Sequence, residues 1–305
     1  MSKDLSVTVV ILTYNEEKHI ERCIRSVQGF STSILVVDSF STDRTIEIAE
    51  SEGATILQHE FVNQAVQLNW ALDNLSIDTE WVMRLDADEI VTLLLANEIP
   101  SVLEQADVNT SGFLVNRCTY FRQKPIKHGG HYPQYVLRIW RNGQARCEAS
   151  WMDEHMELLS GSAQRLNNEI HDDNLNNIGW WTDKHNRYAS REAIVLLDRK
   201  YGFLPNQHDH LGELKGQARV KRWLKHNVYT HLPLGWRVLL FYAYRMVFRM
   251  GFLDGRTGMT FHFLQGFWYR FLVDMKISEV EARMRKDSVD CVEAIRRELS
   301  IDPFF

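Results

Sequence analysis

Two aspartates separated by one residue are the clearest chemical signal in the sequence. Asp86-Ala87-Asp88 follows a short apolar run, and Glu89 comes next. On an extended backbone, carboxylates at positions i and i+2 project to the same face. Hard oxygen ligands in such an array suit Mg²⁺ or Mn²⁺, which bind one or two protein carboxylates and leave other positions to water and phosphate oxygens. We therefore predict Mg²⁺ or Mn²⁺ at Asp88 and Asp86.

Two further polar clusters follow apolar runs in the same way. The cluster Thr13–Glu16 follows Val7–Leu12, and Asp38 follows Ile34–Val37. Each cluster alone also suits helix capping, because Asn, Asp, Ser and Thr are preferred there. In an open parallel sheet, however, ligands collect beyond the carboxyl ends of the strands. Three acidic ends at one edge would repel one another unless a ligand or cation balanced their charge. We therefore expect that they share one ligand site.

The elements that carry these clusters alternate between strand and helix over the first 120 residues. Short apolar strands are predicted at Val7–Leu12, Ile34–Val37, Ala54–Gln58 and Trp81–Leu85, with helices between them, the first capped by Asn15 and the third over Val62–Leu75. This pattern predicts an α/β fold with a mostly parallel sheet covered by helices on both faces. Later strands are predicted at Gly112–Phe121 and Tyr135–Trp140, an irregular stretch over 141–180, and a helix over Thr182–Tyr201.

Composition and missing motifs exclude several classes of protein. The 305 residues are 45% hydrophobic and 25% charged, with a net charge of −5, which excludes long disorder and gives no electrostatic footprint for nucleic acid. Neither a P-loop nor a G-x-G-x-x-G turn follows the first strand. The four cysteines lie far apart, which disfavours a zinc site or a disulfide framework. No apolar stretch is long enough for a transmembrane helix, and we expect a cytoplasmic protein.

In their order and spacing, the segments Val9–Glu16, Val36–Ser39 and Leu85–Glu89 resemble the family 2 glycosyltransferases with the Rossmann-like GT-A fold, over roughly residues 7–160. The likeness implies that Tyr14, Glu16 and Asp38 hold the nucleoside of a UDP-sugar or similar donor. It further implies that Asp86 helps at the ribose and that Asp88 binds the cation. The full set of residues expected around the donor is Thr13, Tyr14, Asn15, Glu16, Asp38, Gln67, Asn69, Arg84 and Asp86.

Two members of that set carry open alternatives. Gln67 and Asn69 stand in a segment similar to a donor-side Gln-x-Asn of the family, but Leu68 replaces a position that is often basic there. Arg84 can contact the diphosphate or pair with a neighbouring carboxylate.

The later part of the chain is similar to bacterial lipopolysaccharide-core glucosyltransferases and their relatives. Their acidic residue after a late strand corresponds to Asp153-Glu154, where Asp153 replaces the usual His. An inverting transfer needs one base to take the proton of the acceptor hydroxyl. We favour Glu154 for that role and keep Asp153 as the second choice. The likeness continues through His171, which is either a third metal ligand or an ordinary loop histidine, and through Gly251–Gly258.

The last third of the chain is basic and aromatic. Asp and Glu are absent from Leu214 to Leu253, and Arg237, Arg245 and Arg249 fall within about 120° in a helical projection. This pattern is typical of a helix at an anionic membrane surface, although an ordinary helical subdomain remains the alternative. We predict a catalytic domain over 1–180 and a C-terminal helical region, basic and aromatic, over 181–305.

The family resemblance, together with these patterns, predicts an inverting, metal-dependent glycosyltransferase. It would move a hexose, with glucose as the first choice, from a UDP-sugar to a lipid-linked, lipopolysaccharide-type or capsule-type glycan on the inner face of the cytoplasmic membrane. Two alternatives compete with this prediction: a catalytically silent membrane-surface binding protein on the same scaffold, and a nucleotidyltransferase. A silent protein has no reason to retain Asp38, Asp86, Asp88 and Glu154 together. A nucleotidyltransferase would usually carry a Gly-rich basic loop after the first strand.

Overall fold

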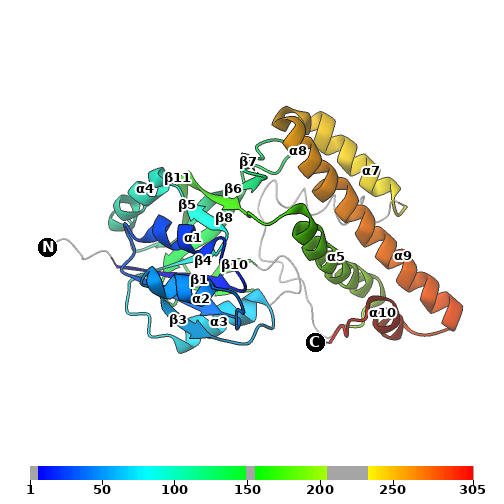
Figure 1. Cartoon of the computed structure of the whole chain (residues 1–305), viewed down its shortest axis with the longest axis horizontal. Helices are drawn as coiled ribbons and strands as arrows, with labels where there is room; N and C mark the ends of the chain where they lie inside the picture. Colours follow the sequence, from blue (N-terminus) through cyan, green and yellow to red (C-terminus); the bar gives the residue numbers. More distant parts are fainter. Residues whose placement is uncertain (1–5, 149–154, 205–232, 305) are drawn as a thin grey trace. The chain divides into compact units, whose positions relative to one another are not determined.

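A computed structural model describes residues 6–148, 155–204 and 233–304 (Figure 1). The chain divides into two compact units, Met1–Asn176 and Asn177–Phe305, called here the N-terminal and the C-terminal unit. All four cysteines, Cys23, Cys118, Cys147 and Cys291, are free and buried.

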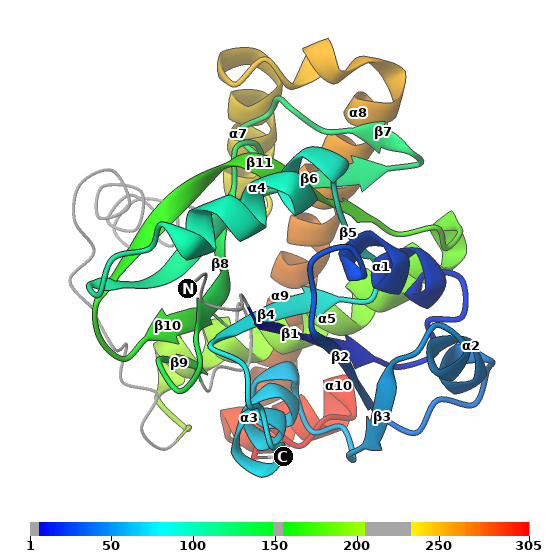
Figure 2. The same cartoon turned by 90° about the vertical axis from the view of Figure 1, so that its left-hand side faces the viewer.

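The N-terminal unit is built on one large mixed sheet. Its strands follow the order β3-β2-β1-β4-β8-β6-β11-β5, and β7 pairs with β6 (Figure 2). The strands β1 to β4 run parallel, whereas β8 is antiparallel to both β4 and β6. The strands are β1 (Val7–Thr13), β2 (Ser33–Asp38), β3 (Thr55–Gln58), β4 (Trp81–Asp86), β5 (Glu89–Val91), β6 (Thr110–Phe121), β7 (Lys124–Pro125), β8 (Tyr135–Arg141) and β11 (Ser162–Asp173), with β9 (Ala145–Cys147) and β10 (Met156–Leu158) forming a separate pair.

Helices cover both faces of this sheet, as the apolar strands predict. The helices of the unit are α1 (Ile20–Val27), α2 (Thr45–Ser51), α3 (Gln64–Asn74) and α4 (Leu93–Glu104). Side chains alternate along β1, so Val9 and Ile11 join the core with α1, α2 and α4, whereas Val10 and Leu12 join the core with α3. All seven residues of β1 are buried, because it lies inside the sheet and is covered twice.

Two local predictions for this unit are wrong. The stretch 141–180, expected to be irregular, contains the twelve-residue strand β11, which pairs with β6 and β5 and includes few apolar residues. Asn15 does not cap α1, which begins at Ile20. Instead Asn15 adopts a left-handed backbone with φ of 55°, which Asn tolerates better than most residues.

The C-terminal unit is helical, as predicted. Its helical segments are α5 (Ile178–Tyr201), α7 (Trp236–Ala243), the π-helical turn η2 (Tyr244–Phe248), the 3₁₀ turn η3 (Gly251–Asp254), α8 (Gly255–Phe261), the π-helical stretch η4 (His262–Trp268), α9 (Tyr269–Asp287) and α10 (Cys291–Leu299). The apolar core lies between α5, α9 and α10. Helix α5 begins four residues earlier than predicted, because the Asn177 side chain accepts a hydrogen bond from Trp180 N.

The predicted basic face of this region is wrong for two of its three arginines. Arg237 is buried and donates to both carboxylate oxygens of Asp274 at 2.9 and 3.0 Å. Arg245 is also buried, and only Arg249 is exposed. Helical spacing groups the arginines on one side of a helix, but it does not say whether that side faces solvent or the interior. Arg237 faces the interior because its partner, Asp274, lies on α9, which packs against it. This partner is 37 residues away in the sequence, so the spacing of the arginines does not reveal it.

The motif Gly251–Gly258 forms part of a buried polar network. Arg245 donates to His262 Nδ1 at 3.1 Å, so the ring proton lies on Nε2, which donates to Asp254 Oδ2 at 3.0 Å. A Cβ atom at Gly258 would lie 2.0 Å from Asp254 Cβ. Glycine is therefore required where α8 packs against this aspartate.

Candidate donor and metal site

The ends of β1 and β2 are joined through a fully buried carboxylate. Thr13 Oγ1 donates to Asp38 Oδ1 at 3.0 Å, and Ser41 N donates to Asp38 Oδ2 at 2.7 Å. Asp38 is 0% exposed. In this structure Asp38 therefore fixes the loop after β2 and does not reach the surface, where a nucleoside would bind.

The loop after β1 presents the exposed part of this edge. Ser41 Oγ accepts from Asn15 N, and Asn15 Oδ1 accepts from Thr42 N, both at 2.8 Å. These bonds hold Asn15 in its left-handed conformation. Tyr14, directly before it, is 58% exposed. Tyr14 and Asn15 are therefore the predicted donor residues that a ligand can reach at this edge.

Glu16 connects this loop to the segment after β11. Leu175 N donates to His19 Nε2 at 2.8 Å, so the proton of the ring lies on Nδ1, which donates to Glu16 Oε2 at 2.5 Å. His19 is buried and Glu16 is half-buried. One face of the Glu16 carboxylate is thus already bonded within the protein.

Gln67 and Asn69 on α3 also bond to the protein itself. Gln67 Nε2 donates to Val37 O at 3.0 Å and to Ser39 Oγ at 2.6 Å. Asn69 bonds both backbone groups of Cys147, donating to its oxygen at 2.9 Å and accepting from its nitrogen at 3.0 Å. Gln67 therefore supports the end of β2, and Asn69 anchors β9, the strand that precedes residues 149–154.

Asp86 lies in a network of buried charges at the end of β4. Arg84 donates to Asp86 Oδ1 at 3.1 Å, and Arg138 on β8 donates to Asp86 Oδ2 at 3.2 Å. Arg138 also pairs with Glu89, whose second oxygen accepts from Asp86 N at 3.1 Å. Of the two roles predicted for Arg84, the structure shows the pairing with a neighbouring carboxylate.

The pKa values of the two acids in this network move in opposite directions. Burial raises the pKa of Asp86, but the charges of Arg84 and Arg138 outweigh it and lower this pKa well below its usual value. Burial raises the pKa of Glu89 to about 7, against the charge of Arg138. Asp86 is therefore an anion whose charge two guanidinium groups already balance.

Asp88 differs from Asp86 in its surroundings. The predicted extended backbone is wrong here, because Ala87 and Asp88 form a turn between β4 and β5. Asp88 is half-buried, its Oδ2 accepts from Asn174 Nδ2 at 2.9 Å, and no cation pairs with it in the described part of the chain. Asp88 is thus the predicted ligand best fitted to hold a divalent cation whose other ligands are water and phosphate oxygens.

The predicted ligands do not form a closed cage for a metal. Residues 6–148, 155–204 and 233–304 hold no group of three or more His, Cys, Asp or Glu side chains placed to bind one ion. Asp38, Asp86 and Asp88 each have separate partners, although β1 places Thr13 beside Asp38 and Leu12 beside Asp86 at one edge of the sheet. A cation at Asp88 would therefore depend on the donor diphosphate for further ligands.

Comparison with known proteins gives the family of the segment that carries this edge of the sheet. Residues 8–151 match the family described as Glycosyl transferase family 2. This segment is a family 2 glycosyltransferase domain. An uncharacterized glycosyltransferase of Rickettsia bellii is 37% identical over 93 residues, which cover 30% of this chain and 31% of that protein. The chain thus spans about a third of the length of the Rickettsia relatives that it matches.

Two further matches cover more of the chain. The lipopolysaccharide core biosynthesis glycosyltransferase LpsC of Rhizobium meliloti is 25% identical over 311 residues, covering 95% of this chain and 98% of that protein. A crystal structure of glucosyl-3-phosphoglycerate synthase from Mycobacterium tuberculosis, in complex with Mn²⁺, uridine diphosphate and phosphoglyceric acid, aligns with 67% of this chain and 81% of its own at 16% identity, with a TM-score of 0.43.

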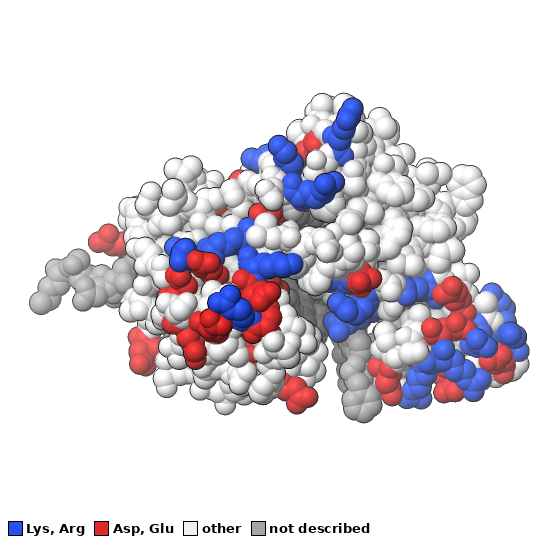
Figure 3. Space-filling model, viewed as in Figure 1, with Lys and Arg blue, Asp and Glu red and all other residues white. Residues whose placement is uncertain are grey.

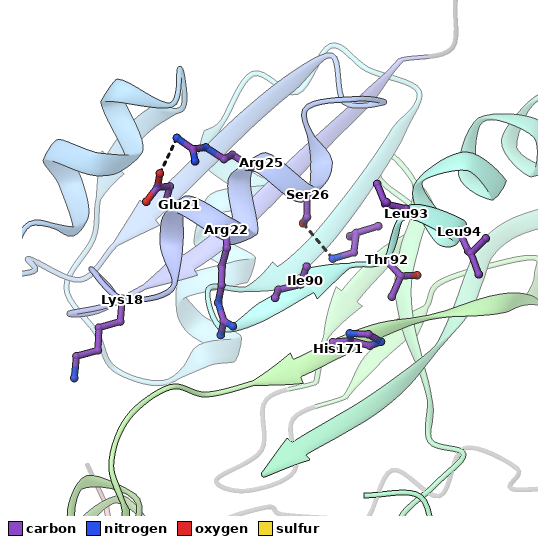
Figure 4. Close-up of a pocket in the computed structure, with 11 residues that line it drawn as sticks. Lys18, Glu21, Arg22, Arg25, Ser26, Ile90, Thr92, Leu93, Leu94 and His171 are labelled. Carbon is purple, nitrogen blue, oxygen red and sulfur yellow. Dashed lines mark hydrogen bonds and ion pairs between the residues drawn. The ribbon is translucent and has the colours of Figure 1, made fainter. Parts of the chain in front are cut away.

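His171 lies on β11, beyond the family 2 domain. Its ring packs on Tyr120 with centroids 4.6 Å apart, and its Nε2 is 3.4 Å from Glu169 Oε1. It lines a hollow of about 740 Å³ between α1, β5 and the start of α4, with Arg22 pointing toward β11 (Figure 4). Both predicted roles of His171, metal ligand and ordinary histidine, stay open.

The predicted catalytic pair directly follows the family 2 domain. Asp153 and Glu154 lie outside the described residues. They are separated from Cys147, which Asn69 anchors, by only five residues.

Sequence reasoning missed one residue of the buried network beside the candidate site. Arg138 lies in the predicted strand Tyr135–Trp140, which was given no role at the site, but it is 4% exposed and pairs with both Asp86 and Glu89. A signal was present, because an arginine within Val-Leu-Arg-Ile-Trp, a run that must be buried, requires a buried carboxylate partner.

Proposed function

We propose that this chain is an inverting, metal-dependent glycosyltransferase that moves a hexose from a UDP-sugar to a lipid-linked or lipopolysaccharide-type glycan. The observation that carries the proposal is the family 2 domain whose Asp88, at the carboxyl edge of the sheet, is left without a cationic partner among the described residues. The full-length likeness to LpsC supports a glycan acceptor. Glucose is our first choice of hexose.

In this proposal some of the described residues contact the donor and others hold the loop that carries them. Tyr14 and Asn15, both exposed, contact the nucleoside, while Asp38 and Gln67 hold the loop on which it rests. Asp88 supplies a carboxylate to Mg²⁺ or Mn²⁺. The cation, when bound, neutralises charge that develops on the departing diphosphate.

We assign the proton transfer to the acidic pair after the family 2 domain. Glu154, with Asp153 as the second choice, takes the proton from the acceptor hydroxyl as its oxygen attacks the anomeric carbon opposite the leaving UDP. Replacing Glu154 by Gln is expected to lower kcat strongly with little change in donor affinity. The variant Asp153→Asn is the matched control, and a larger loss of kcat in that variant would move the base to Asp153.

A lipid-linked acceptor would bring the protein to the inner face of the cytoplasmic membrane as a peripheral protein. None of the described helices is both long and apolar enough to cross a bilayer. The proposal therefore places the contact at the membrane surface, through the C-terminal unit.

Donor binding tests the proposal without knowledge of the acceptor. The apparent melting temperature of the full chain is measured with UDP-glucose, UDP-galactose, UDP-N-acetylglucosamine and UDP alone, each with and without Mn²⁺. A ligand that binds only the folded state raises the melting temperature, and at a fixed concentration the rise is larger for a tighter ligand. We expect a rise with a UDP-sugar that needs Mn²⁺, and no response to any of the nucleotides would contradict the proposal.

A further inference from the structure

The helix formed by α7 and η2 has an inverted distribution of polarity. Its buried side chains include two arginines, Arg237 and Arg245, each 5% exposed. The exposed side is apolar, with Trp236 65% and Phe248 76% exposed. We call this side the apolar face; it consists of Trp236, Leu239, Leu240, Val247 and Phe248.

Buried ion pairs and hydrogen bonds fix the orientation of this helix. Arg237 and Gly235 N both donate to Asp274 on α9, and the Asp274 side chain is buried. Arg245 pairs with His262, and its guanidinium also bonds Gln265 at 2.5 Å. Rotating the helix to bury the apolar face would leave Arg237 and Asp274 without each other, at a cost of several kcal/mol. The apolar face is therefore held outward.

Acidic side chains are missing from the surface around the apolar face. Asp254 is the single carboxylate between residues 233 and 273, and its side chain is 3% exposed. Phe252 and Leu253 extend the exposed apolar surface beyond η2. Figure 3 shows uncharged surface over α7, whereas charged side chains gather over α10 and the end of α9.

Two exposed cations flank this surface. Arg249 follows η2, and Arg256 lies in the first turn of α8. Aromatic residues together with arginines are typical of the boundary between lipid headgroups and acyl chains. The 13 residues of α7 and η2 together span at most about 20 Å, which suits a helix lying in that boundary and not one crossing a core of about 30 Å.

We propose that the apolar face docks into the headgroup–acyl boundary of a lipid bilayer, with Arg249 and Arg256 at the lipid phosphates. This inference rests on the proposed function, because a lipid-linked acceptor requires the enzyme to be at a membrane. It differs from the basic face that the sequence predicts, because apolar side chains make the contact. Binding should therefore weaken only modestly as salt rises, whereas a purely electrostatic contact is screened.

Vesicle sedimentation of the full chain tests this docking. The variant Val247→Ser/Phe248→Ser removes two side chains of the apolar face and no buried contact of Arg237 or Arg245. Its matched control is Leu93→Ser/Leu94→Ser, which removes two leucines of similar exposure, 84% and 68%, from the N-terminal unit. The vesicles consist of phosphatidylcholine with phosphatidylglycerol. We expect the first variant to bind at least about tenfold more weakly, because two apolar side chains no longer enter the bilayer. We expect no change in binding for the control.

Two further measurements complete the test. Circular dichroism shows that both variants are folded, and sedimentation velocity without vesicles gives the oligomeric state. Wild-type affinity of Val247→Ser/Phe248→Ser, or no vesicle binding by the wild-type chain, would overturn the proposal. A wild-type dimer that this variant dissociates would assign the apolar face to a second copy instead. UDP-sugar binding is measured separately, so a failure of docking and a failure of the proposed sugar transfer are distinguished.

Discussion

Replacing Arg138 by Met tests the buried network beneath the candidate site. Arg138 is 4% exposed and donates to Asp86 and Glu89, which lie on either side of the turn that carries Asp88. Met has a similar length and no charge. The substitution therefore removes the cation and leaves both acids in place.

The expected loss of stability depends on pH. Burial raises the pKa of Glu89 to about 7 from the 4.5 of an unfolded chain. Below pH 7 this side chain holds a proton in both proteins, so the variant loses mainly hydrogen bonds to charged groups, on the order of 2 kcal/mol. At pH 8 the wild-type Glu89 is ionised against Arg138, whereas the variant must keep its proton bound, which adds about 1 to 2 kcal/mol.

Hydrogen exchange read by mass spectrometry on peptides from β4 and β8 measures the unfolding free energy of the N-terminal unit in the full chain. We expect Arg138→Met to lower it by about 2 kcal/mol at pH 6 and about 3 to 4 kcal/mol at pH 8. The control Arg138→Met/Glu89→Gln should lose the additional cost at pH 8, since it has no titrating acid at this position. A loss below about 1 kcal/mol at both pH values, or one independent of pH, would refute the network.

Two further predictions concern the C-terminal unit. His185 stacks on Trp181, and burial lowers its pKa to about 4 from 6.5, so its contribution to stability is present above pH 6.5 and lost as the pH falls toward 4. After discounting for partial exposure, the unfolding free energy of the wild type should be about 1 kcal/mol lower at pH 5 than at pH 8. Urea titrations at the two pH values measure this difference, which His185→Gln should lack. An equal change of unfolding free energy with pH in both proteins would count against the assignment. Asp274→Asn leaves Arg237 buried without its anion and should destabilise α7 and α9 by about 3 kcal/mol, which unchanged exchange protection of these helices would disprove.

The strands of the site were predictable because their sequences leave few alternatives. A run such as Val7–Leu12, in which Thr8 is the one polar residue, must be buried on both sides, and three such runs separated by amphipathic helices specify a parallel sheet. The carboxyl ends of parallel strands then meet at one edge. This argument found the edge that the structure shows, with Thr13 beside Asp38 and Leu12 beside Asp86.

Side-chain partners were less predictable, because they come from distant parts of the sequence. Arg138 reaches Asp86 from 52 residues away, and Asp274 reaches Arg237 from 37 residues away. Strand β11 escaped prediction for a related reason, since its pairing with β6 and not its polar sequence makes it a strand. Periodicity grouped Arg237, Arg245 and Arg249 on one exposed face, but the first two are buried, because periodicity does not include the partners that hold a side chain inside.

The central claim is that Asp88 holds a divalent cation that binds the diphosphate of a nucleotide-sugar. Isothermal titration of UDP-glucose into the full chain, with and without Mn²⁺, tests it most directly when wild type, Asp88→Asn and the exposed control Asp78→Asn are compared. We predict Mn²⁺-dependent binding in the wild type and in Asp78→Asn, and at least about 100-fold weaker binding in Asp88→Asn, since even outer partners of metal ligands cost 10- to 100-fold. Mn²⁺-dependent binding of equal strength in Asp88→Asn would contradict the claim.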